Sequence, residues 1–555
     1  MSVRQFNNIQ TPKIPRNNLN LSHSRLLSAD PFYLYPTLVE DCIPGDVWNL
    51  SNEVLIRNNP LASPIMHEQN AFIHYFFVPY RLLWKDWEKF ITGGVDGDFV
   101  ANIPSLTDVM SSYPNAMTQV GGLIEYIYNQ ACDTNLSDMM KVPNAFPLQA
   151  YYMIWNEYYR DPNLMIDLRE IGGTGADWSW LSNMDINGHI VGEYSNNTGF
   201  LKRCWQKDYF TSMLPWQQRG AVPAFNLFGS GSISVNPILN WIANGTGSAN
   251  NGNLSVAAGA LSQPFQFANS VDPNQINLFN TRFQSLLNQL NIDFTGAGLN
   301  ADVHDMRFAF QVTKFLERNA RTGHRYVEFL KAHFPASPND DRLQRPEYIG
   351  GMKIPIVVSE VLQTAEASTV TESGVGSMYG HGVTADRERI GRYRVNEHGV
   401  LLGLLSIMPN AMYMQGVERM FLKESRYDFY FPEFMNLSEQ AVYIEEIYNE
   451  GSPIVERTIG YQGHWDQYRF RRNTVHGLFK SDFAYWHMAR KFSSPPTLNN
   501  DLVMPNESEI HDVTNGIKRV LQVPSEPMYL CHVGNLVSVV RPMPYVAEPG
   551  LIDHN

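Results

Sequence analysis

The sequence predicts an all-β sandwich whose strands are separated by long helical and loop insertions. Three observations support this: strand-like segments near both ends of the chain, amphipathic helices between them, and one long stretch nearly without charge. Strands and helices do not alternate regularly, as they would around a parallel α/β sheet. A hydrophobic fraction of 44% over 555 residues is ample for a buried core.

Residues 1–30 are predicted to form a basic N-terminal arm. The segment carries Arg4, Lys13, Arg16 and Arg25, and no acidic residue precedes Asp30. It is rich in Asn and Pro, a composition typical of mobile segments. We expect these four side chains to face single-stranded DNA, while an ordinary solvated terminus would explain the same composition.

Strand signals begin between residues 33 and 79. The segment FIHYFFV at residues 72–78 is β-rich and apolar on both alternating faces, which is typical of a strand inside a sandwich. Downstream, Leu83, Trp87 and Phe90 follow helical spacing, so residues 82–91 are predicted to form a short amphipathic helix that the glycines at 93 and 94 end.

Further helices are predicted at residues 149–160 and 305–319, and after Thr322-Gly323 a fourth runs to about residue 334. Strand signals return at 354–361, 393–408 and 529–540.

Residues 221–301 are predicted to be a surface insertion in a single domain of residues 31–555. Only Asp272, Arg282 and Asp293 carry charge there, and Gly, Asn and Ser dominate. Loops of this length are uncommon inside compact domains. Residues 278–290 could still form one short helix.

The overall charge pattern bears on partners. Charged residues make up 17% of the chain, against the usual ~25%. Much of the surface is therefore expected to meet other protein, although a large monomer with a neutral polar surface fits equally. The net charge of −13 argues against a protein that wraps nucleic acid over its whole surface.

Motif searches predict no enzyme, cofactor or metal site. P-loop, dinucleotide, zincin and nucleophile-elbow patterns are missing from the sequence. Cys42, Cys132, Cys204 and Cys531 lack the spacing of zinc sites or disulfide frameworks. There is no secretory signal or 18-residue apolar run, so we expect a soluble protein that stays inside the cell that makes it.

Several segments, taken in order, resemble one known family. They are YFFVPYRLLWKDWEKFITGG at 75–94, FPLQAYYMIWNEYYRDPNL at 146–164, DRLQRPEYIGG at 341–351 and RYRVNEHGVLLGLLSIMPNAMYMQG at 392–416. This pattern resembles the major capsid proteins of microviruses, small icosahedral single-stranded-DNA phages, and in particular the gokushovirus branch.

The resemblance implies a viral jelly roll, an eight-stranded antiparallel sandwich, that self-assembles into a T=1-type shell of about 60 copies around a circular single-stranded DNA genome. It also implies a virion protein assembled in the host bacterial cytoplasm without membrane insertion, with a small basic DNA-packaging protein as partner. The insertion at 221–301 would be a threefold protrusion that contacts a bacterial surface receptor. Residues with structural roles in the family signature would be Arg345, Pro346, Glu347, Gly350 and Gly351.

Two other interpretations stay open at this point. A carbohydrate-binding or glycoside-processing β-sandwich could line a sugar groove with Trp465, Tyr468 and Trp486. An internal or scaffolding protein of the same virus is a third possibility, although scaffolds tend to be small, helical and charged.

Overall fold

The computed structural model describes most of the 555-residue chain. The described residues are 15–94, 98–110, 113–132, 136, 139–168, 194–220, 253–254, 265–266, 303–321, 344–362, 378–451, 458–505, 518 and 520–546. The chain divides into two compact units, one of Met1–Gln217 with Ala320–Asn555 and one of Gln218–Asn319. Each unit is described by itself.

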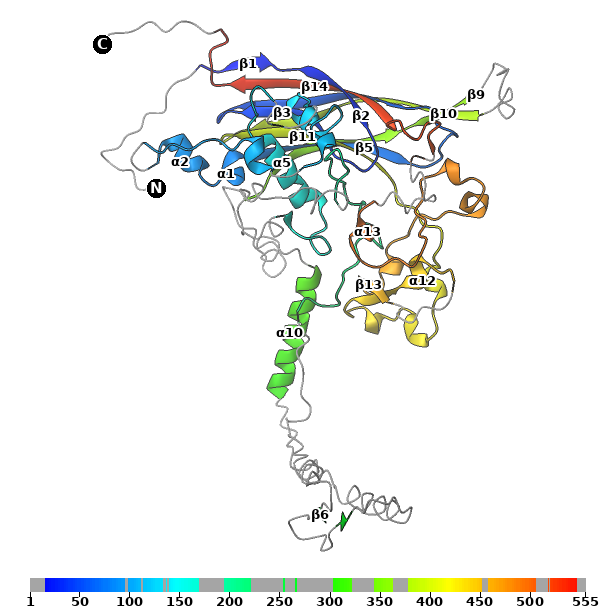
Figure 1. Cartoon of the computed structure of the whole chain (residues 1–555). Helices are drawn as coiled ribbons and strands as arrows, with labels where there is room; N and C mark the ends of the chain where they lie inside the picture. The colour runs from blue at the N-terminus through cyan, green and yellow to red at the C-terminus, as the bar shows by residue number, and fades with distance from the viewer. Residues whose placement is uncertain are drawn as a thin grey trace. The chain divides into compact units, whose positions relative to one another are not determined.

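The first unit is built on two antiparallel sheets, which face each other in Figure 1. One sheet has the order β1-β14-β4-β10-β9, and β2 pairs with β14 beyond β1. The bounds of its strands are β1 Asn17–Asn20, β2 His23–Ala29, β4 Val47–Asn58, β9 Val358–Leu362, β10 Met378–Arg394 and β14 Tyr529–Arg541. The other sheet has the order β3-β11-β5-β8, with bounds Tyr35–Cys42, Gly399–Pro409, Gln69–Pro79 and Glu347–Ile356.

This connectivity is that of a jelly roll. The main strands of the two sheets are β2-β14-β4-β10 and β3-β11-β5-β8, so the chain crosses repeatedly between sheets and the first strands pair with the last. Every neighbouring pair is antiparallel. The predicted eight-stranded antiparallel sandwich is confirmed.

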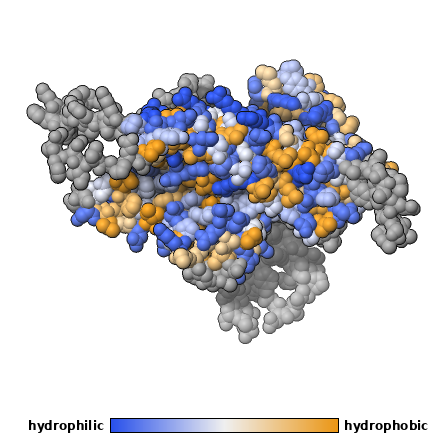
Figure 2. All heavy atoms as spheres, turned by 90° about the horizontal axis from the view of Figure 1, so that it is seen from above, coloured by the Kyte–Doolittle hydropathy of each residue, from blue (hydrophilic) through white to orange (hydrophobic). Residues whose placement is uncertain are grey.

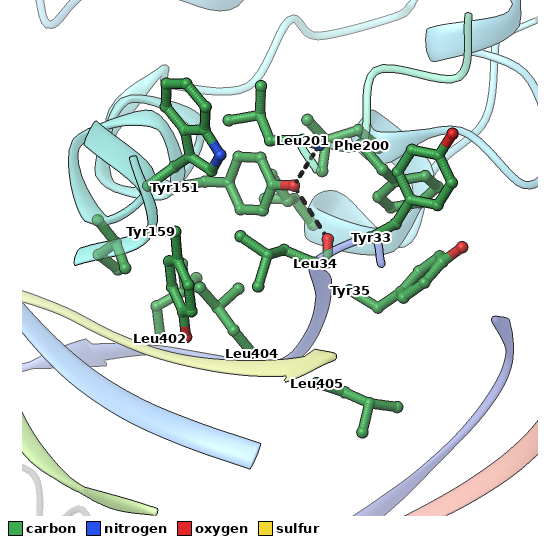
Figure 3. Close-up of a cluster of buried hydrophobic side chains, with 14 of the residues drawn as sticks. Tyr33, Leu34, Tyr35, Tyr151, Tyr159, Phe200, Leu201, Leu402, Leu404 and Leu405 are labelled. Carbon is green, nitrogen blue, oxygen red and sulfur yellow. Dashed lines mark hydrogen bonds between the residues drawn. The ribbon is translucent and has the colours of Figure 1, made fainter. Parts of the chain in front are cut away.

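The two sheets differ in how they are covered. Burial alternates along β14, as expected for a sheet with one face on the core and one toward solvent, whereas every residue of β11 is buried. Helix α5, Phe146–Ile154, packs its apolar residues against β11, on the face of that sheet that does not meet the other sheet. Figure 3 shows how Tyr151 of α5 joins this layer: its hydroxyl donates to the Leu34 carbonyl and accepts from the Leu201 amide, both at 2.9 Å.

A buried polar network connects the two sheets inside the sandwich. Asn52 on β4 donates to the hydroxyl of Tyr75 on β5. That hydroxyl donates in turn to Asn535 on β14 at 3.2 Å, and Asn535 donates to the Thr37 carbonyl on β3 at 2.9 Å. Loss of one member would leave buried polar groups without partners and lower stability. Because the network forms only when the four strands are aligned as observed, it favours a single register between the sheets.

The solvent-facing side of the first sheet is mixed in character. Figure 2 looks down on the side that carries β1 and β14 and shows hydrophobic residues scattered among hydrophilic ones. Leu26, Leu55 and Leu530, on the neighbouring strands β2, β4 and β14, are exposed there.

Most predicted elements are confirmed, with two differences. The helix predicted at 82–91 is broken into α1, Tyr80–Leu83, and α2, Trp87–Thr92, because Trp84 is extended; Gly93 then ends α2 with φ 80°. The helix predicted at 149–160 is α5 continued by a π-helical turn, Trp155–Tyr159, and that at 305–319 is α10, Val303–Arg321, in the second unit. The helices expected to about residue 334 and at 278–290 lie outside the described residues.

The second difference concerns the N-terminal arm. Residues 17–29 were expected to belong to it, but they form β1 and β2, which pair with β14 about 500 residues later. Open backbone groups on β14 offer a partner that local composition cannot reveal. The predicted arm residues before Pro15 lie outside the described part.

Further short elements complete the two units. In the first unit, before β8, they are α3 Leu106–Val109, Asn115–Met117 (3₁₀) and α4 Leu123–Tyr128. Residues 410–528, here called the β11–β14 insertion, contain β12 Gln440–Tyr443, α12 Ile444–Ile447, β13 Thr458–Gln462, α13 Asn500–Val503 and several 3₁₀ turns. The second unit contains β6 Asn253–Leu254, β7 Phe265–Gln266 and α10 up to Asn319. Within the described ranges, no helix is both long and apolar enough to span a bilayer.

Candidate assembly interface

The β11–β14 insertion and residues 209–213 share an interior of their own. Phe210, Tyr413, Val442 and Ile447 are among the buried residues of a separate apolar cluster, joined by residues of α13. Buried charge is enclosed beside it: Glu446, only 2% exposed as a side chain, forms an ion pair with Arg419 at 2.9 Å.

Glu446 is held by several further donors. The Tyr209 hydroxyl donates to it at 3.0 Å and the Tyr443 amide at 3.0 Å. Burial raises the pKa of the Glu446 carboxyl above its usual value, while Arg419 and the hydrogen bonds act in the opposite direction. A buried and fully hydrogen-bonded carboxylate of this kind fixes the insertion in one conformation.

The outer surface of this insertion is unusually apolar. Between residues 420 and 485, its exposed large apolar residues, between 37% and 71% exposed, are Met420, Phe421, Tyr427, Phe429, Tyr430, Phe431, Met435, Leu437, Tyr468, Phe470, Leu478, Phe483 and Tyr485. We call this set the exposed aromatic surface. Aromatic residues are enriched where proteins meet each other, so exposed side chains of this kind on one insertion favour an interface.

A buried tryptophan holds part of the exposed aromatic surface in place. Trp465 is 4% exposed, adopts φ 69° and donates its indole N–H to the Phe434 carbonyl at 3.0 Å. Tyr430 and Tyr468 meet its ring at centroid distances of 5.4 and 6.0 Å. Anchored aromatic side chains lose little conformational entropy when a partner covers them, which is what an interface requires.

Cations and capped turns order the same surface further. The Lys423 ammonium lies over the Phe429 ring at 4.3 Å and donates to the Tyr468 hydroxyl at 2.7 Å. Amides of Ser425 and Glu424 donate to Asp428 and lower the pKa of its carboxyl below the usual value. The surface therefore has a defined shape before any partner arrives.

The residues predicted to face DNA fall in different environments. Arg4 and Lys13 lie outside the described residues, while Arg16 is exposed beside β1. Arg25 on β2 is half-buried and donates to the Tyr126 carbonyl at 3.0 Å. Burial lowers the pKa of Arg25, and Glu40 and Glu125 nearby partly offset this. No acidic residue precedes Arg25 in the sequence, whereas the fold places Glu40 and Glu125 near its side chain.

The family-signature residues occupy the start of β8. Pro346 is buried and its carbonyl accepts the Tyr158 hydroxyl at 2.6 Å. The Glu347 carboxylate accepts the Tyr393 hydroxyl at 2.7 Å and thereby joins β8 to β10. Arg345 is half-buried.

The two glycines that follow are required by close approach. A Cβ at Gly351 would lie 2.5 Å from a ring carbon of His74, and one at Gly350 would lie 3.0 Å from the Ile390 carbonyl oxygen. These positions therefore fix the packing of β8 against its neighbours.

Sequence reasoning missed the exposed aromatic surface. Phe421 and Phe431 are indistinguishable in sequence from core residues such as Phe76, which is 1% exposed. The high aromatic content beside a low charged fraction is the one signal that could have suggested it. Trp465, considered above for a sugar groove, is buried as an anchor, so it does not line one. Within the described ranges, no three His, Cys, Asp or Glu side chains are placed to hold a metal ion.

Comparison with known proteins agrees with this picture of a subunit that meets others. Capsid protein VP1 of Chlamydia phage 1 is 30% identical over 617 aligned positions, which cover 99% of this chain and 97% of the relative. Capsid protein VP1 of Bdellovibrio phage phiMH2K is 31% identical over 493 positions, or 85% of each chain. Capsid protein VP1 of Spiroplasma virus 4 is 25% identical over 571 positions, with 99% and 98% covered.

The family model described as "Capsid protein (F protein)" matches residues 7–551. The resemblance to microvirus capsid proteins is thus confirmed, and a carbohydrate-active sandwich is not favoured. The chain belongs to the phage F-type capsid protein family and is a structural major capsid protein of a microvirus.

Proposed function

We propose that this capsid protein closes into a T=1-type icosahedral shell of about 60 copies around a circular single-stranded DNA genome, and that the exposed aromatic surface is a principal contact between copies. The observation that carries the proposal is the contrast within the β11–β14 insertion. Its interior is packed and hydrogen-bonded, yet thirteen large apolar side chains between residues 420 and 485 are exposed. The role is structural rather than catalytic.

The proposal can be tested by placing charge on this surface. Phe421 is 71% and Phe470 is 59% exposed, so Phe421→Asp with Phe470→Asp should leave the subunit folded. A charge buried against a neighbour without a partner costs several kcal/mol, which is enough to abolish closure when it recurs at every copy. Val120→Asp, at a site elsewhere in the chain that is 84% exposed, is the control.

Size-exclusion chromatography and negative-stain microscopy give the readout. The double variant should elute as small species with an unchanged circular dichroism spectrum, while Val120→Asp should form shells. Shells of normal yield from the double variant would refute the role of this surface.

The insertion at 221–301 is proposed to form a protrusion around the threefold axes and to contact the bacterial surface receptor. Its sequence is Gly- and Asn-rich and nearly uncharged, and closure entropy grows slowly with loop length. Replacing residues 230–300 with a short Gly-Ser linker should give shells that do not infect. Recovery of the variant only as inclusion bodies would place the segment in the core instead.

The N-terminal segment is proposed to face the packaged genome. Arg4, Lys13 and Arg16 would each neutralise at most one phosphate, independently of sequence and in a salt-sensitive way, whereas Arg25, which is half-buried and bonded to the Tyr126 carbonyl, would contribute less. The remaining charge would come from a small basic packaging protein, since this chain carries a net −13. Assembly would take place in the host bacterial cytoplasm.

Changing all four basic residues to Gln should reduce packaged DNA while empty shells still form. Cleavage of this segment by protease on intact particles would show that it lies outside.

A further inference from the structure

A hollow of about 570 Å³ lies beside the second sheet of the sandwich. It is bounded by β5, the π-helical turn after α5, the start of β8 and the segment that follows residue 202. Its lining residues include His74, Tyr159, Arg203, Trp205, Lys207 and Tyr348. The volume lies within the range of pockets that hold small organic ligands.

One wall of the hollow carries a cation without a counter-ion. The Arg203 guanidinium lies over the Phe72 ring at 4.4 Å and over the Tyr159 ring at 5.5 Å. It donates to the Ser406 hydroxyl at 2.8 Å, and no carboxylate of the described residues lies within ion-pair distance of it. Burial lowers the pKa of Arg203, which means that this positive charge is held away from water at a cost. An anionic partner would remove that cost.

A neighbouring wall of the hollow is aromatic. Tyr348 is 51% exposed, and its ring meets those of His74 and Phe76 at 5.8 and 5.5 Å. His74 is hydrogen-bonded to the Tyr159 hydroxyl at 2.8 Å, and burial together with Arg203 lowers the pKa of its imidazole to about 4. At neutral pH this wall is uncharged, and Tyr348 offers a face on which a flat ring can stack.

The rim adds two more donors. Lys207 is half-exposed and pairs with Asp161, so the one carboxylate of this rim is already neutralised. Trp205 lines the hollow with its indole N–H buried, and that N–H has no acceptor in the described residues. Of these two donors, Lys207 is the one that a ligand in the hollow can reach, because the Trp205 N–H has almost no accessible surface.

We propose that the hollow binds one nucleotide of a single-stranded nucleic acid, with the base stacked at Tyr348 and a phosphate near Arg203 and Lys207. A flat ring joined to an anion is the ligand that an aromatic wall next to a desolvated cation fits. The proposal rests on the proposed function, because the enclosed genome is the polynucleotide that would supply the nucleotide. A carboxylate-bearing segment of a neighbouring copy would satisfy Arg203 but would leave the aromatic wall uncovered.

The test uses the purified full-length protein and a fluorescently labelled oligodeoxythymidine of twelve nucleotides. Fluorescence anisotropy should show that Tyr348→Ala weakens binding about tenfold, since one base loses its stacking partner. Lys207→Gln should reduce the slope of log affinity against log salt by about 0.7, the value for one phosphate contact to a single strand. Tyr545→Ala, at a site 73% exposed, and Lys89→Gln, at a lysine side chain 65% exposed, are the matched controls and should bind like the unmodified protein.

Shell formation by every variant, followed in parallel by negative-stain microscopy, separates this proposal from the assembly role. If the Tyr348→Ala variant assembles but its binding to the oligonucleotide is weak, the nucleotide site is supported, whether or not the proposed aromatic contact between copies holds. Unchanged oligonucleotide binding overturns it, and unchanged binding with failed assembly assigns the hollow to a protein segment instead. Thymidine 5′-monophosphate should compete only at much higher concentration, and equal competition would overturn the polynucleotide as the source.

Discussion

The hydrogen bond between Glu347 and Tyr393 should couple β8 to β10 by a measurable free energy. Their oxygens are 2.7 Å apart, and burial together with the Glu347 carboxylate raises the pKa of the Tyr393 hydroxyl above its usual value. A hydrogen bond to a charged acceptor contributes about 1.5–3 kcal/mol, and both residues are only half-buried, so water recovers part of it. We therefore expect a coupling of about 1 kcal/mol.

A double-mutant cycle measures this coupling directly. Glu347→Ala should lower the free energy of unfolding by about 1.5 kcal/mol and Tyr393→Phe by about 1 kcal/mol, while the double variant should lose about 1 kcal/mol less than their sum. Urea unfolding of the unassembled subunit, followed by tryptophan fluorescence, supplies the values. Glu388→Ala, at an exposed site on β10, should change stability by less than about 0.5 kcal/mol.

Additive effects in this cycle would refute the coupling. A Glu347→Ala subunit with normal stability and normal shell yield would refute the structural role assigned to the signature glutamate as well.

Three further predictions concern stability. His74→Gln should remove a contribution to stability that depends on pH. The pKa of His74 in the folded state is about 4, below the usual 6.5, so between these pH values only the unfolded state binds a proton at this site. The stability of the unmodified protein should therefore fall as the pH drops from about 6.5 to about 4, and urea midpoints measured with and without the substitution test this. Gly351→Ala should cost about 1–3 kcal/mol because its Cβ would lie 2.5 Å from the His74 ring, whereas Gly391→Ala, where no atom lies within 4 Å, should cost less than about 1 kcal/mol; equal thermal shifts would contradict the packing argument. Asp46→Ala should lower the free energy of unfolding in urea by about 3 kcal/mol or more, because the Asp46 carboxylate is fully buried and paired with Arg541 at 3.0 Å. The double variant Asp46→Ala with Arg541→Ala should lose at least as much stability. A loss below about 1 kcal/mol for Asp46→Ala would show that the pair is dispensable.

The hydrophobic pattern of the sequence was enough to locate the strands that are buried on both faces. β5 and β11 are mostly apolar and buried along nearly their whole length, because the sandwich covers one face and helices or loops the other. β10 escaped detection: residues 385–389 are exposed, and four of the five are charged. Its strand conformation comes from pairing with β4, whose residues precede it by more than 300 positions. Pairing across that distance leaves no periodic signal in the sequence.

The family signature and the low charged fraction were also available from sequence alone, and together they indicated a shell-forming protein with a jelly roll. Which apolar residues meet solvent was decided only by the tertiary structure, as Phe76 and Phe421 illustrate at 1% and 71% exposure. The gathering of Arg203, Tyr348 and His74 around one hollow was likewise invisible, because they come from three segments spread over more than 270 positions. The amino-acid sequence determined which surfaces could be buried, whereas long-range strand pairing decided which were, because burial depends on neighbours that only the closed sandwich brings together.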